Sequence, residues 1–159
     1  MLVEVRVKCV IREPIASRYV LILETIDGGI FLPISIGVFE AEAIYVELNK
    51  IIPPRPMTFD FITGILAALN DVKIEKIVIY DVLECIYKAK LQLMHNDKLL
   101  DIECRPSDAI ALGLRLNTAV YVEDKVLKNN KCICKEKLNL KEKSIIKNIL
   151  IAQRSSWNS

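Results

Sequence analysis

The chain has 159 residues, of which 52% are apolar, and a formal net charge of +2. This length and composition predict one compact domain with a buried core and argue against a disordered protein. No window holds the roughly 18 consecutive apolar residues of a membrane-spanning helix. The first residues alternate apolar and charged, which does not fit a signal peptide. We therefore expect a cytoplasmic protein with no membrane partner.

Charge is distributed unevenly along the chain. Residues 1–127 hold 14 Lys and Arg against 18 Asp and Glu, a net charge of −4, whereas residues 128–159 hold 8 against 2, a net charge of +6. We therefore divide the sequence into a folded domain, 1–127, and a basic C-terminal tail, 128–159. Within the tail, residues 144–152 have an amphipathic pattern that fits a helix. Electrostatic attraction for nucleic acid would come from this tail or from a local cluster of arginines.

The N-terminal half predicts an antiparallel meander followed by two helices. The strand-like segments, separated by a proline and by a tight Asp-Gly-Gly turn, are 2–12, 18–26 and 30–34. After Gly37, residues 38–49 show the spacing of an amphipathic helix. A proline-rich connector then leads to a second helix, with Thr58 as its expected cap, that ends near residue 69.

The C-terminal half of the domain predicts three more strands, a helix and a short strand. The strand-like segments are 73–83, 86–95 and 99–104. The helix runs from Pro106 to about Leu116, and residues 119–122 form the short strand. A turn of helix is expected at 123–127. Gly64 and Gly113 lie inside the second and third helices, where glycine often marks a close approach of another segment.

The sequence Arg105-Pro106-Ser107-Asp108 combines several signals at one helix start. Pro106 ends the preceding strand, Ser107 is expected to cap the helix, and Asp108 lies where the helix dipole favours an anion. Arg105 presents five N–H donors and needs an oxygen partner. The same plan occurs 50 residues earlier, from Arg55 to Asp60. The repetition indicates two similar helix starts that could meet in one site.

Several kinds of chemistry can be set aside. The single histidine, His95, lies beside a predicted hairpin turn, so no serine or cysteine has an evident histidine base. The sequence also has no glycine-rich phosphate loop and no Cys/His pattern typical of a zinc site. What remains is a set of carboxylates and arginines at helix starts.

These carboxylates and arginines define the candidate site. We predict that Glu40, Asp60 and Asp108 are catalytic and hold Mg²⁺ or Mn²⁺, and that Arg55, Arg105 and Ser107 bind substrate. The alternative is structural, because acids are favoured in the first turns of helices and arginine bridges can lock helices to a sheet. The pattern alone leaves both interpretations open.

Four motifs, in this order, resemble the bifunctional nuclease domain family. They are Leu32-Pro33-Ile34-Ser35-Ile36-Gly37, Glu40-Ala41-x-x-Ile44, Pro54-Arg55-Pro56-x-Thr58-x-Asp60, and Arg105 to Leu112 followed by Val120-Tyr121-Val122. The resemblance spans residues 2–127. It implies an α+β fold with a mixed, largely antiparallel sheet, helices packed on it and a single compact domain. It also implies a homo-oligomer, for which we favour a dimer, and RNase or DNase activity.

One position departs from this family. The family commonly has Thr-His-Asp where this chain has Thr58-Phe59-Asp60. A mechanism through carboxylates and a metal would survive the change, whereas one that uses that histidine would not. We therefore carry two hypotheses. The first is a metal-assisted nuclease acting on RNA or DNA, and the second is a non-catalytic oligomeric binding or regulatory module.

Overall fold

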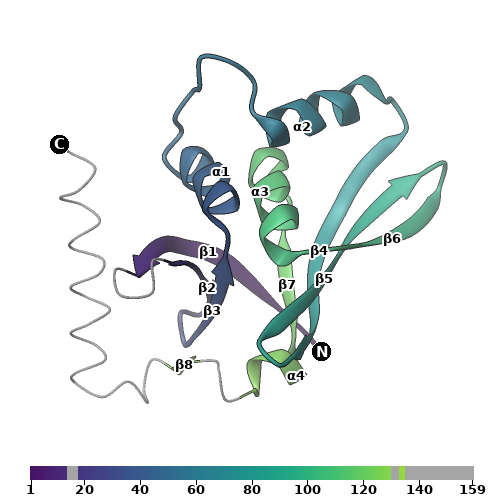
Figure 1. Ribbon diagram of the computed structural model, residues 1–159. Helices are drawn as coiled ribbons and strands as arrows, with labels where there is room; N and C mark the ends of the chain where they lie inside the picture. The colour runs from purple at the N-terminus through teal and green to yellow at the C-terminus, as the bar shows by residue number, and fades with distance from the viewer. Residues whose placement is uncertain (14–17, 130–132, 135–159) are drawn as a thin grey trace.

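The computed structural model describes residues 1–13, 18–129 and 133–134, and its elements follow the predicted order (Figure 1). The strands are β1 (Leu2–Glu13), β2 (Arg18–Thr25), β3 (Ile30–Ile36), β4 (Val72–Leu83), β5 (Ile86–His95), β6 (Lys98–Cys104), β7 (Val120–Glu123) and β8 (Ile133–Cys134). The helices are α1 (Val38–Leu48), α2 (Thr58–Ala68), α3 (Pro106–Leu116) and α4 (Asp124–Leu127). The expected α+β fold in one compact domain is therefore confirmed.

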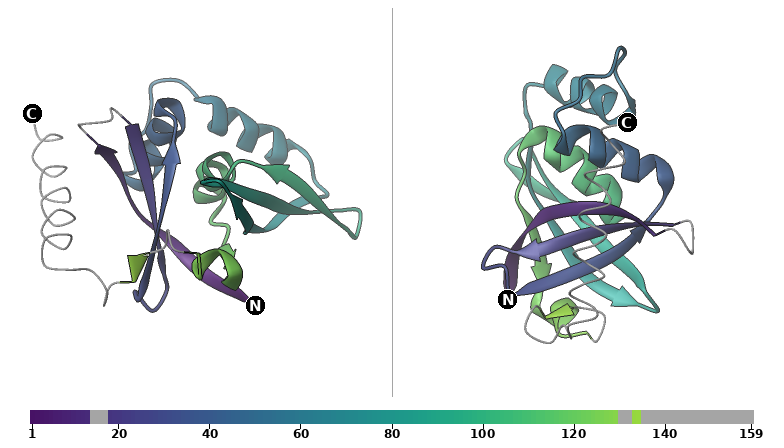
Figure 2. Two further views of the ribbon diagram at one scale, coloured as in Figure 1. Left: turned by 60° about the horizontal axis from the view of Figure 1, so that its bottom comes forward. Right: turned by 90° about the vertical axis from the view of Figure 1, so that its left-hand side faces the viewer.

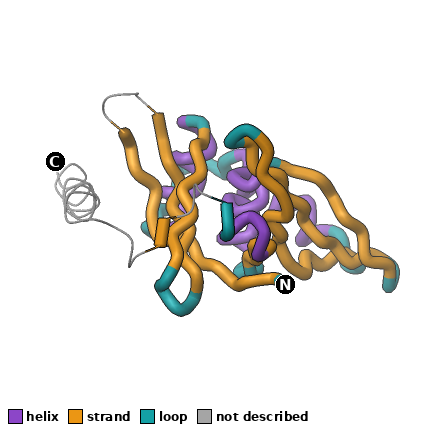
Figure 3. Tube along the Cα trace, turned by 90° about the horizontal axis from the view of Figure 1, so that it is seen from below, coloured by secondary structure: helices purple, strands orange, loops and turns teal. Residues whose placement is uncertain are grey.

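All strands belong to one mixed sheet with the order β6-β5-β4-β7-β1-β2-β3-β8. Every neighbouring pair is antiparallel except β4 and β7, which are parallel. The sheet bends strongly, so that β1–β3 and β4–β6 stand on opposite sides of the molecule with helices between them (Figures 2 and 3). β8 pairs with β3, so the sheet extends past residue 127.

The position of α3 follows from this strand order. The chain leaves β6 at one edge and must re-enter the sheet at β7, with β5 and β4 between them. Such a connection needs a crossover, and α3 supplies it by crossing the face of β5 and β4. α1 and α2 then pack on α3. The start of α3 consequently lies near the end of β3, and its last turn lies near the start of α2.

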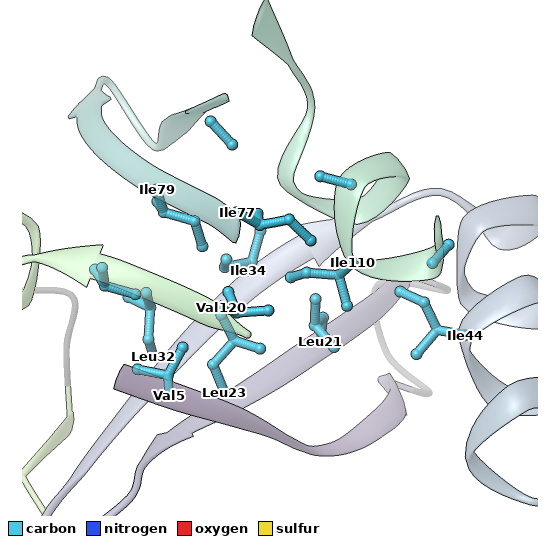
Figure 4. Close-up of a cluster of buried hydrophobic side chains, with 14 of the residues drawn as sticks. Val5, Leu21, Leu23, Leu32, Ile34, Ile44, Ile77, Ile79, Ile110 and Val120 are labelled. Atoms are coloured by element: carbon cyan, nitrogen blue, oxygen red, sulfur yellow. The ribbon is translucent and has the colours of Figure 1, made fainter. Parts of the chain in front are cut away.

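The hydrophobic core forms where α3 meets both sides of the bent sheet (Figure 4). Ile110 of α3 is fully buried among side chains from β2, β4 and α1. The fully enclosed residues of this cluster include Leu21, Leu23, Leu32, Ile44, Ile77, Ile79 and Val122. Burying an aliphatic side chain of this size contributes about 1.5–3 kcal/mol. α3 is therefore the helix on which the domain depends most.

Details at the helix starts differ from the predictions. The N-cap of α2 is Met57, and Thr58 is its first helical residue. The N-cap of α3 is Arg105, with Pro106 in the first position, so Ser107 is not the cap. α2 has no buried residue, and Leu69, its C-cap, is 48% exposed. α2 packs on α3 and is not enclosed between a helix and the sheet. Its apolar side chains are therefore only partly covered.

One prediction about the rest of the chain falls outside this description. The amphipathic segment 144–152, like most of the tail, lies outside the described residues. None of the helices in the described part of the chain has the length and apolar character needed to cross a bilayer.

The two helical glycines behave differently, and this gives a matched test. A Cβ at Gly113 would lie 2.5 Å from Ile77 Cδ1 in the core, whereas a Cβ at Gly64 would meet no atom within 4 Å. We expect Gly64→Ala to raise the free energy of unfolding by about 0.5–1 kcal/mol, because alanine is the better helix former. Gly113→Ala should lower it by about 1–2 kcal/mol, because overpacking outweighs that gain. Urea denaturation of both variants tests this, and equal stabilisation would contradict the close packing of Gly113.

Candidate active site at the start of α3

A cleft of about 340 Å³ opens beside the start of α3. Its walls come from three segments that are distant in sequence. The segments are the end of β3 with the turn into α1 (34–37), the β4–β5 turn with the start of β5 (85–87), and Arg105-Pro106-Ser107. The strand pairing explains their proximity, because Cys104 at the end of β6 lies opposite Ala89 of β5. Two of the four family motifs thus border one cavity.

Arg105 joins two predicted acids at the rim of this cleft. Its Nε and Nη2 donate to the two carboxylate oxygens of Asp108 at 2.6 and 2.9 Å. Its Nη2 also lies 2.8 Å from Glu40 Oε1. Both acids raise the pKa of the guanidinium, Asp108 more than Glu40. The Arg105 side chain is 65% exposed, so a ligand can reach it.

Gly37 makes room for Glu40. It is the N-cap of α1, and Glu40 lies in the first turn of that helix. A Cβ at position 37 would overlap the Glu40 carboxylate, so only glycine lets this side chain fold back over the helix start. The Glu40 side chain is 16% exposed, half as much as that of Asp108 at 33%. The Ile36-Gly37 motif therefore positions an acid as well as lining the cleft.

Ser107 is the buried polar group of the cleft. The residue is 5% exposed, and its hydroxyl forms no hydrogen bond with another described residue. It occupies the second position of α3, where backbone N–H groups have no partner inside the helix. The Ser107 hydroxyl and these N–H groups can donate hydrogen bonds to a ligand in the cleft. This end of α3 can accept an anion.

Asp60 takes part in a different cluster. Its Oδ1 accepts from Arg115 Nε at 2.7 Å, and its Oδ2 accepts from the Met57 N–H at 2.9 Å. Arg115 is 4% exposed and also donates to the carbonyls of Ala111, at 2.7 Å, and Ala43, at 3.3 Å. One guanidinium thus connects α1, α2 and α3. The hydrogen bonds to Arg115 and to the Met57 N–H lower the pKa of Asp60.

Phe59 packs on the same buried arginine. Its ring centroid lies 5.6 Å from the Arg115 guanidinium carbon. Phe59 is absent from the cleft walls and contacts the core instead. The residue that replaces the family's histidine therefore belongs to the contact between α2 and α3.

The structure does not gather all predicted site residues. Glu40, Asp108 and Arg105 share one network beside Ser107, whereas Asp60 belongs to the Arg115 cluster and Arg55 is exposed with no ion pair among the described residues. In the described part of the chain, no three His, Cys, Asp or Glu side chains are close enough to hold a metal ion by themselves. The helix starts that follow Arg55 and Arg105 therefore differ in the ion pairs that their residues form.

Cys104 and His95 carry reactive side chains but do not belong to the Arg105 network. Burial raises the pKa of the Cys104 thiol to about 11, so it is protonated at neutral pH and is a poor nucleophile. His95 lies at the end of β5 with Nδ1 3.3 Å from Asp71 Oδ2. His95 lies beside a hairpin turn and does not line the cleft.

Sequence reasoning missed Arg115 and the β4–β5 turn. Arg115 resembles an ordinary basic residue in the last turn of a helix, and only its apolar surroundings on α3 could have indicated burial. Cys85 to Tyr87 carry no motif. Their place in the cleft follows from strand pairing, which the sequence does not state.

The Asp60–Arg115 pair predicts a pH-dependent stability. Because the folded-state pKa of Asp60 is lowered, its contribution is complete above the ordinary aspartate value, about 3.9, and is lost as the pH falls through the folded-state value. Asp60→Asn should lower the free energy of unfolding at pH 7 by about 2–3 kcal/mol, because it leaves Arg115 buried without a carboxylate. Below pH 4 the difference from the unmodified protein should shrink. Denaturation at several pH values tests this, and a pH-independent difference would contradict it.

Comparison with known proteins agrees with this geometry. Residues 21–135 match the bifunctional nuclease domain. Two uncharacterised proteins of Mycobacterium tuberculosis, from strains CDC 1551 / Oshkosh and ATCC 25618 / H37Rv, are each 39% identical to this chain over 124 residues, which cover 78% of this chain and 73% of theirs. The family match, residues 21–135, includes the residues of the cleft, of the Arg105 network and of the Arg115 cluster. The chain belongs to the bifunctional nuclease domain family.

Proposed function

We propose that this protein is a nuclease that hydrolyses phosphodiester bonds of RNA or DNA at the cleft beside α3. The observation that carries the proposal is the exposed Arg105, held by Glu40 and Asp108 at a cleft that Ser107 also lines. An arginine fork and a helix start are both suited to phosphate. Membership of a family with this name supports the same chemistry.

Arg105 is the phosphate-binding group in this proposal. Its planar fork matches two non-bridging phosphate oxygens, and the phosphate would replace one or both carboxylates as its partner. The Ser107 hydroxyl and the first-turn N–H groups of α3 donate to the same phosphate. These donors would stabilise the extra negative charge of the transition state. Arg55 stays a predicted contact to a more distant phosphate.

Glu40 is the proton acceptor. Its Oε1 accepts from Arg105, and we assign Oε2 to take a proton from the attacking water. The water oxygen then bonds to phosphorus, the ester P–O bond breaks, and the leaving oxygen takes a proton from solvent. Asp108 orients Arg105 through two hydrogen bonds. We leave Asp60 out of this set because it is engaged with Arg115.

Mg²⁺ or Mn²⁺ remains part of the proposal. Such ions are commonly held by one or two protein carboxylates together with phosphate oxygens of the substrate. Glu40 and Asp108 supply two carboxylates beside the cleft, so the donor set fits an ion that enters with the substrate. The bound ion would neutralise phosphate charge.

The second candidate is a non-catalytic oligomeric binding module. The observation that favours it is that Glu40, Asp60 and Asp108 are all ion-paired with arginine. In this case the acids only hold helices in place. The homo-oligomer remains a prediction for both candidates, and sedimentation of the full chain measures it.

Substitution of Arg105 tests the nuclease directly. With Mg²⁺ or Mn²⁺ present, Arg105→Ala should lower kcat/KM for a labelled oligonucleotide by about 10²–10³, because a preorganised charge on the phosphate is lost. Glu40→Gln should lower kcat by about 10²–10⁴, because it removes the base. The matched control is Lys98→Ala, which removes a charge at the opposite end of β6. Activity that persists in folded Arg105→Ala and Glu40→Gln would reject this site.

Restoring the family's histidine tests the importance of position 59. Because Phe59 packs on Arg115 and does not line the cleft, Phe59→His should change kcat by less than about twofold, well below the effect of a general acid or base. Steady-state kinetics on the same oligonucleotide measure this. A gain of tenfold or more would place that histidine in the chemical step.

A further inference from the structure

We infer that the cleft holds one unstacked base, and that the protein therefore selects single-stranded over duplex nucleic acid. The inference rests on the proposed function, since it takes the cleft beside α3 as the nucleic-acid site. It adds the form of the substrate and names Phe39 as a residue that determines this selectivity.

The cleft has the size and the walls for one base. Its volume of about 340 Å³ is at the lower end of the range of about 300–1,000 Å³ found for small-molecule sites. The wall made by β3 and the β4–β5 turn is largely apolar, with Ile34, Ile36 and Ile86. The lining contributed by the start of α3 includes Arg105 and Ser107. A nucleotide has the same two-sided character, with a flat base on one side and a charged phosphate on the other.

An exposed aromatic residue follows the cleft-lining Gly37 by two positions in the sequence. Phe39 is 79% exposed in the first turn of α1. It stands between Gly37, which lines the cleft, and Glu40, which bonds Arg105. Exposed aromatic rings beside a phosphate-binding group are platforms on which successive bases of a single strand stack. Phe39 can therefore hold the base that neighbours the one in the cleft.

A duplex cannot use these contacts without distortion. Its bases are stacked and paired, so a base can enter the cleft only after it is flipped out of the helix, at a cost in free energy. In a single strand the bases are already free to leave the stack. Residues 1–127 carry a net charge of −4, so this part of the chain supplies no excess of positive charge that could repay this cost for a duplex.

Binding of short oligonucleotides tests the inference. The probes are one labelled single strand and the same strand annealed to its complement, measured by fluorescence anisotropy with the full chain, in chelator to prevent cleavage and at one fixed salt concentration. We expect the single strand to bind at least about tenfold more tightly. Phe39→Ala should weaken single-strand binding by about tenfold, through the loss of one stacking contact, and leave duplex binding unchanged.

The chain offers a close control for Phe39. Phe61 of α2 is also an exposed phenylalanine, at 65%, and does not line the cleft. Phe61→Ala should leave both affinities unchanged. Because both rings are exposed, neither substitution should impair folding, and circular dichroism checks this.

The outcomes separate this inference from the proposed function. Equal affinity for the single strand and the duplex, or equal effects of Phe39→Ala and Phe61→Ala, would overturn the inference. Hydrolysis of both substrates at equal rates would also overturn it and would leave the nuclease proposal standing. Selective single-strand binding without hydrolysis under any divalent ion would support the inference and reject the nuclease.

Discussion

The parallel pairing of β7 with β4 is the constraint from which the rest of the structure follows. Because β7 lies inside the sheet and β6 at its edge, α3 must cross β5 and β4 to connect them. The helix is thereby buried along most of its length, with Ile110 fully enclosed. Its two ends are then fixed relative to β3, α1 and α2. Each end carries an arginine, and these two residues organise the remaining helices.

The two arginines show opposite uses of the same side chain. Arg115, 4% exposed, has acceptors from three helices and is enclosed by Phe59. A buried guanidinium is tolerated only when its hydrogen bonds are satisfied, so this cluster fixes one arrangement of α1, α2 and α3. Arg105, 65% exposed, exchanges its partners at little cost because water can replace them. Arg115 therefore suits a structural role and Arg105 suits ligand binding.

Most of the fold could be predicted from the sequence because its signals are local. Alternating apolar residues marked the strands, and the turn at Asp27 to Gly29 and the proline in Arg105-Pro106 marked boundaries within a residue or two. The mixed sheet came from the family resemblance, since a parallel contact between β4 and β7 leaves no local signal. The caps of α2 and α3 were misplaced by one or two residues, because Ser107 resembles a cap but is the second helical residue.

The site was predicted only in part, for a related reason. Arg105 and Asp108 are three residues apart, and their bond is local. The contact to Glu40 needed α1 beside α3, which the sequence does not state. Asp60 was included in the predicted site because an acid in the first turn of a helix is equally suited to a functional site and to a structural ion pair. Its partner lies 55 residues away, inside an apolar helix face.

In the proposed nuclease, the Arg105 network would hold the phosphate-binding group in place before the substrate binds. Without a ligand, Glu40 and Asp108 neutralise the guanidinium and hold it at the rim of the cleft. A phosphate must displace these carboxylates, so it gains less affinity than it would from an unpaired arginine. The displaced carboxylates, however, stay beside the phosphate, where a base and a ligand for a divalent ion are needed. In the proposed nuclease, the same ion pairs that argue for a structural role would therefore arrange the groups that hydrolysis requires.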